Sequence, residues 1–551
     1  MPVPVSSRAC PADGRLLTNG RYTTLLTAAG SGYSAWGQLA VSRWSADPTE
    51  DSDGFFIYVR DVDSGVFWSL GQLPVPRVAD SQTAQFGPGL LALTLQDGDI
   101  AARLEVCVAR EADVELRRVT LRNNGEQPRR IELTSYIEVV LNDPAADAAH
   151  PAFSKLFVQT ERVADSTTLL ARRRPRAASE TPCWLVHALV GASQPNPPCQ
   201  YETDRVRFIG RGYTLAAPSA LISAEPLSGT VGNVLDPIVS WRQIVELAPG
   251  AEAQLTFLLG VAIDRPTAIA LAERYADTIL IEAEFQAASG GQPLTDLPPV
   301  RPDASATGAL PSPLISRQGS TAANNMAALA EDEPLQFWNG YGGFSADGRE
   351  YVIRIRPDAG GRPLLPPQPW TNVIANPNFG FLASETGAGY TWSQNSRENR
   401  LTPWYNDPVL DPHGEALYLR DENNGAFWSL QPGPLPQSTL YEVRHGFGYS
   451  RYRHISQGLE QEVCVFAPRE DPVKLALIRL HNLSDTPRRL SLFAYFRLVL
   501  GVLPTDYRNE LRVLRDPASG ALFAENRNRE FTGRIASVSY THLTLPTNRE
   551  V

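Results

Sequence analysis

Residues 388–408 hold the densest group of side chains in the sequence that could bind a ligand. The segment reads AGYTWSQNSRENRLTPWYNDP, with four aromatic residues, three asparagines and two arginines in 21 positions. Amides and guanidinium groups pair with sugar hydroxyls, and an aromatic ring stacks on the C–H face of a sugar. This composition predicts a carbohydrate site with the candidate binding residues Asn395, Arg397, Asn399, Arg400, Trp404, Asn406 and Asp407.

Within this segment we expect Arg397, Asn399 and Arg400 to contact hydroxyls or phosphate, and Trp404 to be the stacking surface. The alternative is a polar loop that only holds strands together, with Trp392 and Trp404 buried, and both alternatives are compatible with the composition. A related segment occurs earlier in the chain. At the corresponding position it reads AWGQLAVSRW, without the Asn/Arg run. A structural loop should tolerate the same chemistry in both copies, so the difference favours binding.

Other kinds of site have little support. No G-x-S-x-G elbow occurs, and the seven histidines are scattered without H-x-x-x-H spacing. Cys107 and Cys464 are flanked by valines, which is typical of buried small hydrophobes rather than nucleophiles. The pieces GSGYSAWG and NGYGGF lack the strand–turn–helix context of a phosphate loop. We therefore predict no catalytic residue, no metal ligand and no cofactor in this chain.

Composition excludes further classes of protein. With 551 residues, 43% of them hydrophobic, the chain can bury the cores of several domains. A net charge of −10 argues against nucleic-acid binding, and five cysteines cannot form a disulfide framework. The sequence has no apolar run of 18 residues and no signal-peptide core in MPVPVSSRACPADGR. We expect a cytoplasmic region that makes no membrane contact of its own.

The elements that position these residues belong to a duplicated domain. Tyr58–Leu70 reads YVRDVDSGVFWSL and Tyr418–Leu430 reads YLRDENNGAFWSL, so eight of 13 positions match. The correspondence runs in order from Gly30 and Gly387 to Tyr136 and Tyr495. Such a long, ordered match indicates a duplicated domain rather than a short repeat.

Each copy has the pattern of a β-protein. Residues 116–122 and 130–141 alternate apolar and polar side chains around an Asn-Asn-Gly turn, which predicts a hairpin; 474–480 and 489–500 repeat it. A helix is expected after Asp264, with a partial apolar stripe to Tyr275. We predict a mainly β fold of two tandem sandwiches, at 1–289 and 331–536, joined by a Pro-rich linker with a short helix at 290–330. Residues 537–551 match no continuation and resemble translated adapter sequence, so we expect a non-native tail and a natural protein that continues.

Several long segments resemble one family. LLTNGRYTTLLTAAGSGYSAWGQLAVSRW, ADAAHPAFSKLFVQTE and NVIANPNFGFLASETGAGYTWSQNSRENRLTPWYNDPV are similar to the C-terminal region of cyclic β-1,2-glucan synthases. That region belongs to the former glycosyltransferase family 36, now placed with the phosphorylases of glycoside hydrolase family 94. The resemblance implies two β-supersandwich modules followed, in the family, by an (α/α)6 barrel with the general acid and the phosphate site. This chain matches the sandwiches only, so no catalytic residue can be assigned from the family.

The resemblance also implies a function for the parent enzyme. The expected role is the carbohydrate-binding and structural sandwich region of an enzyme that makes β-1,2-glucan and controls its chain length by phosphorolysis. The implied partners are β-1,2-glucan or another β-glucoside and inorganic phosphate, in a parent anchored at the inner membrane with this region on the cytoplasmic side. Two alternatives remain: part of a soluble β-1,2-oligoglucan phosphorylase, or a non-catalytic glucan-binding module.

Overall fold

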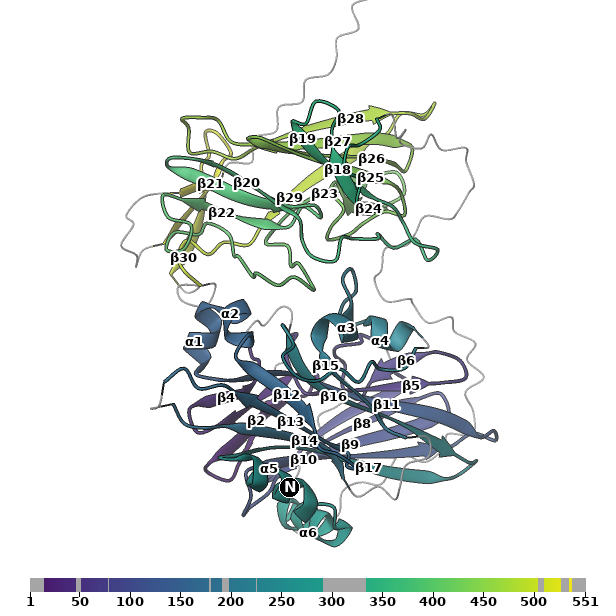
Figure 1. The fold of residues 1–551 in the computed structure, drawn as a ribbon. Helices are drawn as coiled ribbons and strands as arrows, with labels where there is room; N and C mark the ends of the chain where they lie inside the picture. Colours follow the sequence, from purple (N-terminus) through teal and green to yellow (C-terminus); the bar gives the residue numbers. More distant parts are fainter. Residues whose placement is uncertain are drawn as a thin grey trace, which may run out of the picture. The chain divides into compact units, whose positions relative to one another are not determined.

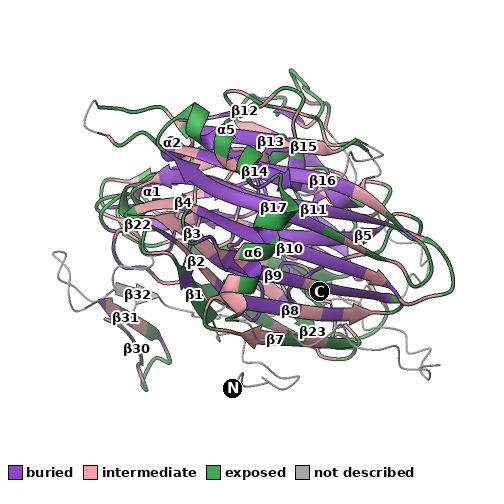
Figure 2. Cartoon of the chain, turned by 90° about the horizontal axis from the view of Figure 1, so that it is seen from below, coloured by how far each residue is buried: buried purple, intermediate pink, exposed green. Residues whose placement is uncertain are grey.

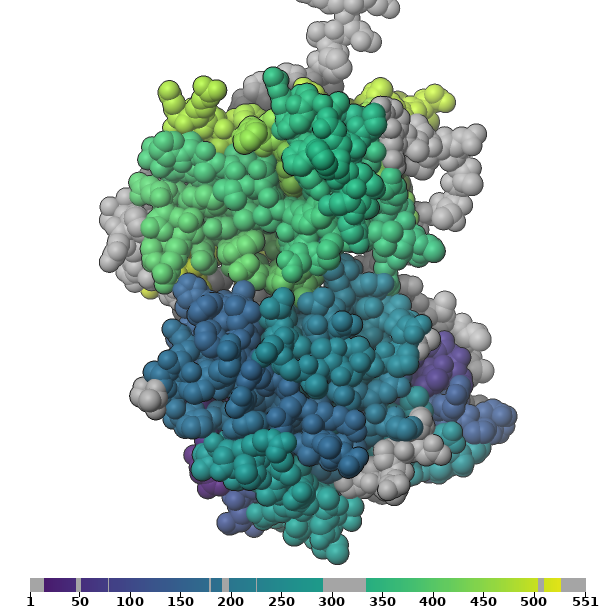
Figure 3. Space-filling view, viewed as in Figure 1, coloured from purple at the N-terminus to yellow at the C-terminus, as the bar shows by residue number. Residues whose placement is uncertain are grey.

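The structure is a computed structural model that describes residues 14–45, 51–77, 79–177, 180–190, 198–223, 225–290, 333–503 and 510–526, and the backbone of 535–537. The chain divides into two compact units, Met1–Pro313 and Leu314–Val551. Unit 1 runs from purple to teal, and unit 2 from green to yellow (Figures 1 and 3). Except for Gly290 and the backbone of Ser537, the expected linker at 290–330 and the expected tail at 537–551 lie outside the described residues.

The first sheet of unit 1 has nine antiparallel strands. Its order is β1-β2-β3-β4-β11-β16-β15, with β5 also paired to β11 and β6 paired to β5. These strands are β1 (Gly14–Thr18), β2 (Tyr22–Thr27), β3 (Gly32–Trp36), β4 (Leu39–Ser42), β5 (Phe56–Asp61), β6 (Phe67–Ser69), β11 (Arg129–Asn142), β15 (Gln200–Asp204) and β16 (Pro237–Leu247).

The second sheet of unit 1 has eight strands in the order β12-β13-β14-β17-β10-β9-β8-β7. Val59 and Leu133 of the first sheet share one core with Leu104 and Val119 of the second, and all four are almost fully buried. This arrangement is a β-sandwich, in which alternate residues of each strand point into the shared core. The strands are β7 (Ser81–Phe86), β8 (Leu90–Asp97), β9 (Ile100–Val108), β10 (Val114–Asn123), β12 (Val158–Arg162), β13 (Thr168–Arg173), β14 (Trp184–Val190) and β17 (Glu252–Ala262).

The described part of unit 1 also contains six short helices. The expected helix after Asp264 is confirmed as α5, and the Asp264 carboxylate caps it by accepting a hydrogen bond from Thr267 N at 2.8 Å. Helices α5 and α6 lie across the outer face of the eight-stranded sheet (Figure 2), where Tyr275 and Phe285 are buried. The helices are α1 (Pro144–Ala149), α2 (Pro151–Lys155), α3 (Arg205–Ile209), α4 (Ser219–Ile222), α5 (Arg265–Arg274) and α6 (Thr278–Ser289).

Unit 2 is built from smaller sheets. Its sheets have the orders β18-β19-β25-β26-β27-β28, β20-β21-β22, β24-β23-β29 and β30-β31-β32. The strands are β18 (Gly342–Phe344), β19 (Glu350–Ile355), β20 (Thr371–Asn376), β21 (Phe379–Ser384), β22 (Gly389–Ser393), β23 (Glu415–Asp421), β24 (Phe427–Ser429), β25 (Tyr441–Gly446), β26 (Tyr449–Ser456), β27 (Leu459–Phe466), β28 (Leu475–Asn482), β29 (Leu490–Phe496), β30 (Leu511–Arg515), β31 (Leu522–Asn526) and β32 (Ile535–Ser537).

The two predicted hairpins are wrong, although their strands are present. β10 pairs with β9 and β17, whereas β11 pairs with β4, β5 and β16, so the turn after Asn123 carries the chain from one sheet to the other. Asn123 Nδ2 donates to the carbonyls of Gln127 and Leu247, at 2.7 and 3.1 Å, and holds this crossing. Alternation fixes which face of a strand is apolar, but it does not say whether two such strands share a sheet or face each other across the core.

The two units repeat the same local structures. Tyr58 pairs with Ser69 in β5–β6, and Tyr418 pairs with Ser429 in β23–β24, which confirms the equivalence of the two matching segments. Each pair of strands is held by an arginine at or just before the start of the strand that pairs with its first member, β11 in unit 1 and β29 in unit 2: Arg129 binds Asp61, and Arg488 binds Asp421. The prediction of a mainly β chain of sandwich sheets is confirmed.

Candidate functional site

The aromatic residues of the candidate segment form a stack. Tyr390 and Trp392 are two positions apart on β22 and therefore lie on one face of that strand. The ring of Tyr390 lies 5.1 Å from Trp392 and 5.1 Å from Trp404, with interplanar angles of 36° and 30°. All three rings are half-buried, so Trp392 and Trp404 are not the fully buried pins of the structural alternative.

Arg400 lies on this stack. Its guanidinium carbon is 5.9 Å from the centre of the Tyr390 ring, within reach of a cation–π interaction. Its Nη1 donates to Val502 O at 3.3 Å, and its backbone bridges to Gly501, so the side chain is held in place. Burial lowers the pKa of Arg400 below its ordinary value. The structure brings Arg400 and Trp404 together around Tyr390, a residue that was not among the predicted binding residues.

The turn after β22 carries two exposed charged side chains, Arg397 and Glu398. Asn395 Oδ1 accepts hydrogen bonds from Arg397 N and Glu398 N, both at 2.9 Å, so its side chain shapes the turn. Arg397 Nε lies 3.3 Å from Glu398 Oε1, and the Arg397 side chain is 61% exposed. Arg397 is thus presented to solvent on a turn whose backbone is fixed.

Asn399 is buried beneath the same turn. Its Nδ2 donates to Ser393 O at 2.8 Å, while its Oδ1 has no hydrogen-bond partner among the described residues. Because a buried carbonyl oxygen without a donor is costly, Asn399 has one acceptor left for a ligand hydroxyl or a water.

Asn406 and Asp407 form a separate turn. Asp407 Oδ1 accepts hydrogen bonds from Val409 N and Leu410 N, at 2.9 and 3.1 Å. Asn406 is exposed and has a φ of 48°, a conformation that asparagine tolerates better than most residues. The contacts of Asp407 show a role in the turn, and the structure places no described contact between this turn and Arg397.

The ion pair of Glu415 and Lys474 is linked to the strand and the segment that carry the aromatic stack. Glu415, at the start of β23, accepts hydrogen bonds from Thr391 Oγ1 at 2.6 Å, Thr402 Oγ1 at 2.5 Å and Lys474 Nζ at 2.5 Å. Burial would raise the pKa of Glu415, but the Lys474 charge and these hydrogen bonds hold it below its ordinary value. Through Thr391 and Thr402, the carboxylate ties β22 to the segment that carries Trp404.

Unit 1 has an equivalent aromatic pair but a shorter turn. Tyr33 and Trp44 have ring centres 5.5 Å apart, at 49°. In unit 1, four residues (36–39) separate Ala35 from its partner Ala40. In unit 2, seven residues (393–399) separate the equivalent Trp392 from its partner Arg400. The stack is part of the duplicated fold, and the enlarged turn with Arg397 is particular to unit 2.

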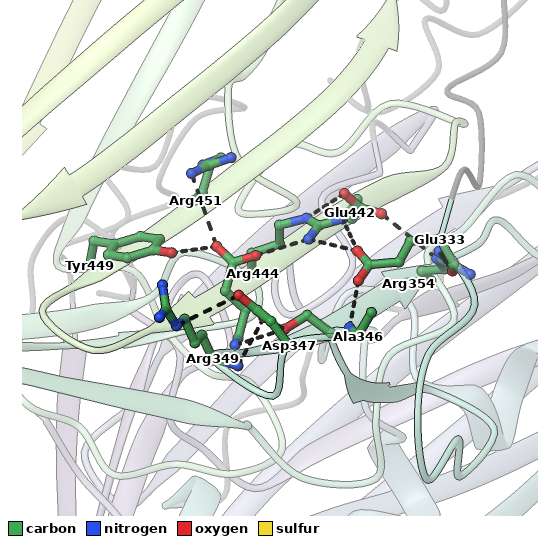
Figure 4. Close-up of polar contacts among 11 residues, drawn as sticks. Glu333, Ala346, Asp347, Arg349, Arg354, Glu442, Arg444, Tyr449 and Arg451 are labelled. Carbon is green, nitrogen blue, oxygen red and sulfur yellow. Dashed lines mark hydrogen bonds and ion pairs between the residues drawn. The ribbon is translucent and has the colours of Figure 1, made fainter.

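A second charged cluster lies on the face of β19, β25 and β26 that points away from the core (Figure 4). Arg444 Nη1 lies 2.9 Å from Glu350 and 3.2 Å from Glu333, and Arg444 Nε lies 2.8 Å from Glu442. The adjoining cavity, of about 140 Å³, is lined by Glu442, Arg444, Arg451, Arg453 and Glu462. Arginines and carboxylates alternate here and neutralise one another, so this cluster favours no ligand of either charge.

The described residues contain neither a metal-binding cluster nor a membrane-spanning helix. In these ranges no three His, Cys, Asp or Glu side chains come together as a metal site. None of the helices in the same ranges is long and apolar enough to cross a membrane.

The chain is similar to proteins that act on carbohydrates. The family model "Glycosyl hydrolase 94, supersandwich domain" matches residues 12–278 and 349–550. Cyclic beta-(1,2)-glucan synthase NdvB of Rhizobium meliloti (strain 1021) is 30% identical over 88% of this chain and 23% of its own length. N,N'-diacetylchitobiose phosphorylase of Vibrio furnissii is 33% identical over 31% of this chain and 20% of its own length. A bacterial glucoamylase complexed with acarbose has a TM-score of 0.32 at 8% identity, over 52% of this chain and 39% of that one. The chain thus spans less than a quarter of the length of either curated relative.

Proposed function

The chain belongs to the glycosyl hydrolase 94 supersandwich family, and from this premise we propose that it is the sandwich region of a cyclic β-1,2-glucan synthase-like enzyme, with the turn at 395–400 bordering the glucan site. The parent enzyme would make β-1,2-glucan and set its length by phosphorolysis, which uses inorganic phosphate. This chain would supply binding and support, and the acid and the phosphate site of phosphorolysis would come from elsewhere in the parent.

One observation carries the choice of parent. The match to the glucan synthase extends over 88% of this chain and therefore includes both units, whereas the matches to the Vibrio furnissii phosphorylase and the Paenibacillus borealis solabiose phosphorylase extend over 31% and 42%. The similarity to the synthase therefore covers both copies of the duplicated sandwich. The partial matches to phosphorylases support a second candidate: the chain could be part of a soluble β-1,2-oligoglucan phosphorylase.

The geometry of unit 2 supports a sugar ligand. Trp404 packs against Tyr390 and stays half-exposed, so part of its surface is open to the C–H face of a glucose ring. Arg397 is exposed on the same segment, and Asn399 Oδ1 has no hydrogen-bond donor among the described residues. Neutral hydroxyls suit this mixture of a flat apolar surface and polar donors and acceptors.

The proposed setting is the cytoplasmic side of the inner membrane, because the parent would be membrane-anchored. The four described cysteines are all free, which fits a reducing compartment.

Glucan titration of the full chain tests the proposal. Trp404→Ala should weaken β-1,2-glucan binding about tenfold in calorimetry, because an aromatic stacking contact is worth ~1.5 kcal/mol. Trp44→Ala removes the equivalent half-buried ring from unit 1 and should leave the affinity unchanged. Equal losses in both variants would contradict a site in unit 2.

A turnover assay separates the remaining readings. The chain alone should release no glucose 1-phosphate from β-1,2-glucan and phosphate, because phosphorolysis needs a positioned acid, and the family resemblance assigns that acid to the barrel rather than to the sandwiches. Release of glucose 1-phosphate would show that the chain is itself a phosphorylase. If the assembled parent also lacks turnover but keeps glucan binding, the non-catalytic binding module is correct.

A further inference from the structure

A dense run of positive charge closes β13 in unit 1. Arg172, Arg173, Arg174 and Arg176 occupy four of five consecutive positions in a chain whose net charge is −10. Within the described part of the chain, none of the four forms an ion pair with a carboxylate. Arg172 instead donates to the neutral Gln159 Oε1, at 3.0 and 2.9 Å. The run therefore carries positive charge that the protein does not pair.

Three of these guanidinium groups gather around one aromatic ring. Phe157 follows α2, and its backbone carbonyl accepts a hydrogen bond from Arg174 N at 2.8 Å. The guanidinium carbons of Arg173, Arg174 and Arg176 lie 5.0, 5.6 and 5.7 Å from the centre of this ring. All three are within reach of a cation–π interaction, so three like charges share one ring. We call these three residues the arginine cluster.

Main-chain carbonyls hold two members of the arginine cluster in place. Arg173 Nη1 donates to Ser154 O at 3.0 Å, and Arg174 Nη2 donates to Leu156 O at 3.2 Å. Because a guanidinium has five N–H donors, these bonds orient each group and leave donors for a ligand. Arg173 is half-buried, whereas Arg174 and Arg176 are exposed. The outer two arginines are therefore both positioned and accessible.

Neighbouring carboxylates do not neutralise the cluster. Glu180 Oε2 accepts a hydrogen bond from Arg176 N at 3.0 Å, so this carboxylate is engaged with the backbone. Burial lowers the pKa of Arg173, and the Arg176 charge lowers it further, although Glu180 and Asp147 act in the opposite direction. Like charges held close together destabilise each other, and an anion placed among them relieves that repulsion.

The chemistry of the cluster fits a phosphate monoester better than a carboxylate. A phosphate monoester carries nearly two negative charges near pH 7 and three strong acceptor oxygens, and guanidinium forks bind such oxygens in pairs. A carboxylate has only one charge and two oxygens. The Phe153 ring is 51% exposed and lies 5.9 Å from the Arg176 guanidinium carbon. It offers an apolar surface to the organic group that carries the phosphate.

We propose that the arginine cluster on the Phe157 ring is a binding site for the phosphate group of a phosphate monoester. Arg174 and Arg176 would donate to the phosphate oxygens from the solvent side, and Arg173 would add its charge from beneath. Phe153 would pack against the organic part of the ligand. This site lies wholly within unit 1, and the proposal does not depend on the glucan site of unit 2.

Calorimetric titration of the full chain with glucose 1-phosphate at low salt tests the proposal. Arg174→Gln/Arg176→Gln should weaken binding at least about tenfold, because a hydrogen bond to a charged group is worth that much or more. The matched control is Arg21→Gln/Arg130→Gln, which removes the same charge from two exposed arginines of unit 1 that are ion-paired. The control should change the affinity by less than about twofold, as expected for long-range effects in salt.

Two further probes identify the source of the phosphate. Phe153→Ala should weaken the binding of glucose 1-phosphate severalfold and leave that of inorganic phosphate unchanged, because only the ester has an organic part. Vesicles of phosphatidylcholine with phosphatidic acid present the same monoester on a lipid. Tighter binding to these vesicles than to glucose 1-phosphate, lost in Arg174→Gln/Arg176→Gln, would identify the ligand as a lipid headgroup.

Three outcomes would overturn the proposal. The first is a native chain that binds none of the three probes. The second is equal affinity for glucose 1-phosphate in the native chain and in Arg174→Gln/Arg176→Gln, with unchanged melting curves. The third is an equal loss in both double variants, which would show a general effect of charge. Arg176→Gln alone gives the same comparison should the double variant lower the melting temperature.

Discussion

Arg397 and Arg400 have different roles although they are three positions apart. The Arg400 guanidinium is held by Val502 O and lies over Tyr390, so its contacts are within the protein. Arg397 is 61% exposed and has one ion-pair partner, Glu398, on its own turn. An exposed pair of this kind contributes little to stability. Arg397 is therefore the arginine that is free to meet a ligand.

Replacing Arg397 tests this assignment. An arginine hydrogen bond to a ligand is worth ~1.5–3 kcal/mol, so Arg397→Ala should weaken glucan binding by the parent enzyme roughly ten- to a hundredfold. The melting temperature should stay unchanged, because the side chain is mostly in solvent. Arg349→Ala is the matched control, since Arg349 is 84% exposed and also faces a neighbouring carboxylate, Asp347. Unfolding of the variant, or an unchanged affinity, would make the turn structural.

Two buried histidines differ in their partners. His187 of unit 1 lies 2.9 Å from both Ser135 Oγ and Leu258 O, and burial lowers its pKa to about 4. His454 of unit 2 packs 4.4 Å from the Tyr441 ring, and its ring nitrogens have no hydrogen-bond partner among the described residues. Burial lowers the pKa of His454 to about 3. Both side chains are therefore neutral in the folded chain near pH 7.

Acid should destabilise the chain through these histidines. In the unfolded chain His187 takes up a proton below pH ~6.5, whereas folded His187 stays neutral down to about pH 4. The free energy of unfolding therefore keeps its full value above pH ~6.5 and falls as the pH drops toward 4. His454→Phe should flatten this acid dependence in unit 2 and stabilise it by ~1 kcal/mol, because it removes unpaired polar atoms. His187→Phe should instead destabilise unit 1 by ~2 kcal/mol through the loss of its partners. Calorimetry between pH 4 and 8 measures both, and equal effects of the two substitutions would contradict this account.

At the scale of elements, β22 depends on a glycine that has a counterpart in unit 1. A Cβ on Gly389 would lie 1.8 Å from Leu382 O, and a Cβ on Gly32 would lie 1.9 Å from Leu25 O. Gly389 pairs with Ala383 on β21, so the two backbones approach here more closely than any side chain allows. This close approach sets the position from which Tyr390 and Trp392 project.

Gly389→Ala should therefore destabilise unit 2 by about 3 kcal/mol, because β21 and β22 must separate to admit the methyl group. Gly360→Ala is the control: its Cβ would meet only the side-chain oxygen of Asp358, at 3.3 Å, and stability should change by less than ~0.5 kcal/mol. Urea unfolding followed by tryptophan fluorescence gives both values. A Gly389→Ala variant as stable as the control would show that β22 shifts without cost.

The sequence predicts strands better than their partners. Alternation correctly places β10, β11, β28 and β29, because it records which side of a strand is buried. It fails for the pairing, because the same pattern serves a hairpin and a crossing between sheets. At the candidate site, residue type alone could not separate Asn395 and Asp407, whose side chains cap turns, from Arg397, which is exposed. Tyr390 could have been included, because its spacing of two from Trp392 on a strand puts both rings on one face.

At the scale of the whole chain, the two copies of the fold differ in how completely their strands are paired. In unit 1, β10 and β11 have neighbours on both sides, and α5 and α6 cover the outer sheet. In the described part of unit 2, β28 and β29 each have one neighbour. Because opening free energies follow the local number of buried contacts, unit 2 should open at lower denaturant concentration than unit 1.

The ion pair beneath the aromatic stack makes this difference accessible to covalent labelling. The chain has only two lysines, Lys155 in unit 1 and Lys474 in unit 2. Each ammonium lies against a buried carboxylate, Lys155 at 2.6 Å from Asp236 and Lys474 at 2.5 Å from Glu415, and the two side chains are 11% and 22% exposed. An amine-directed acylating reagent should reach each lysine mainly when its own unit opens. In rising urea, acetylation of Lys474 should precede that of Lys155 in peptide mass spectra, and the reverse order would show that unit 1 opens first. Arginine-rich composition has thus left each unit with a single lysine that reports its opening.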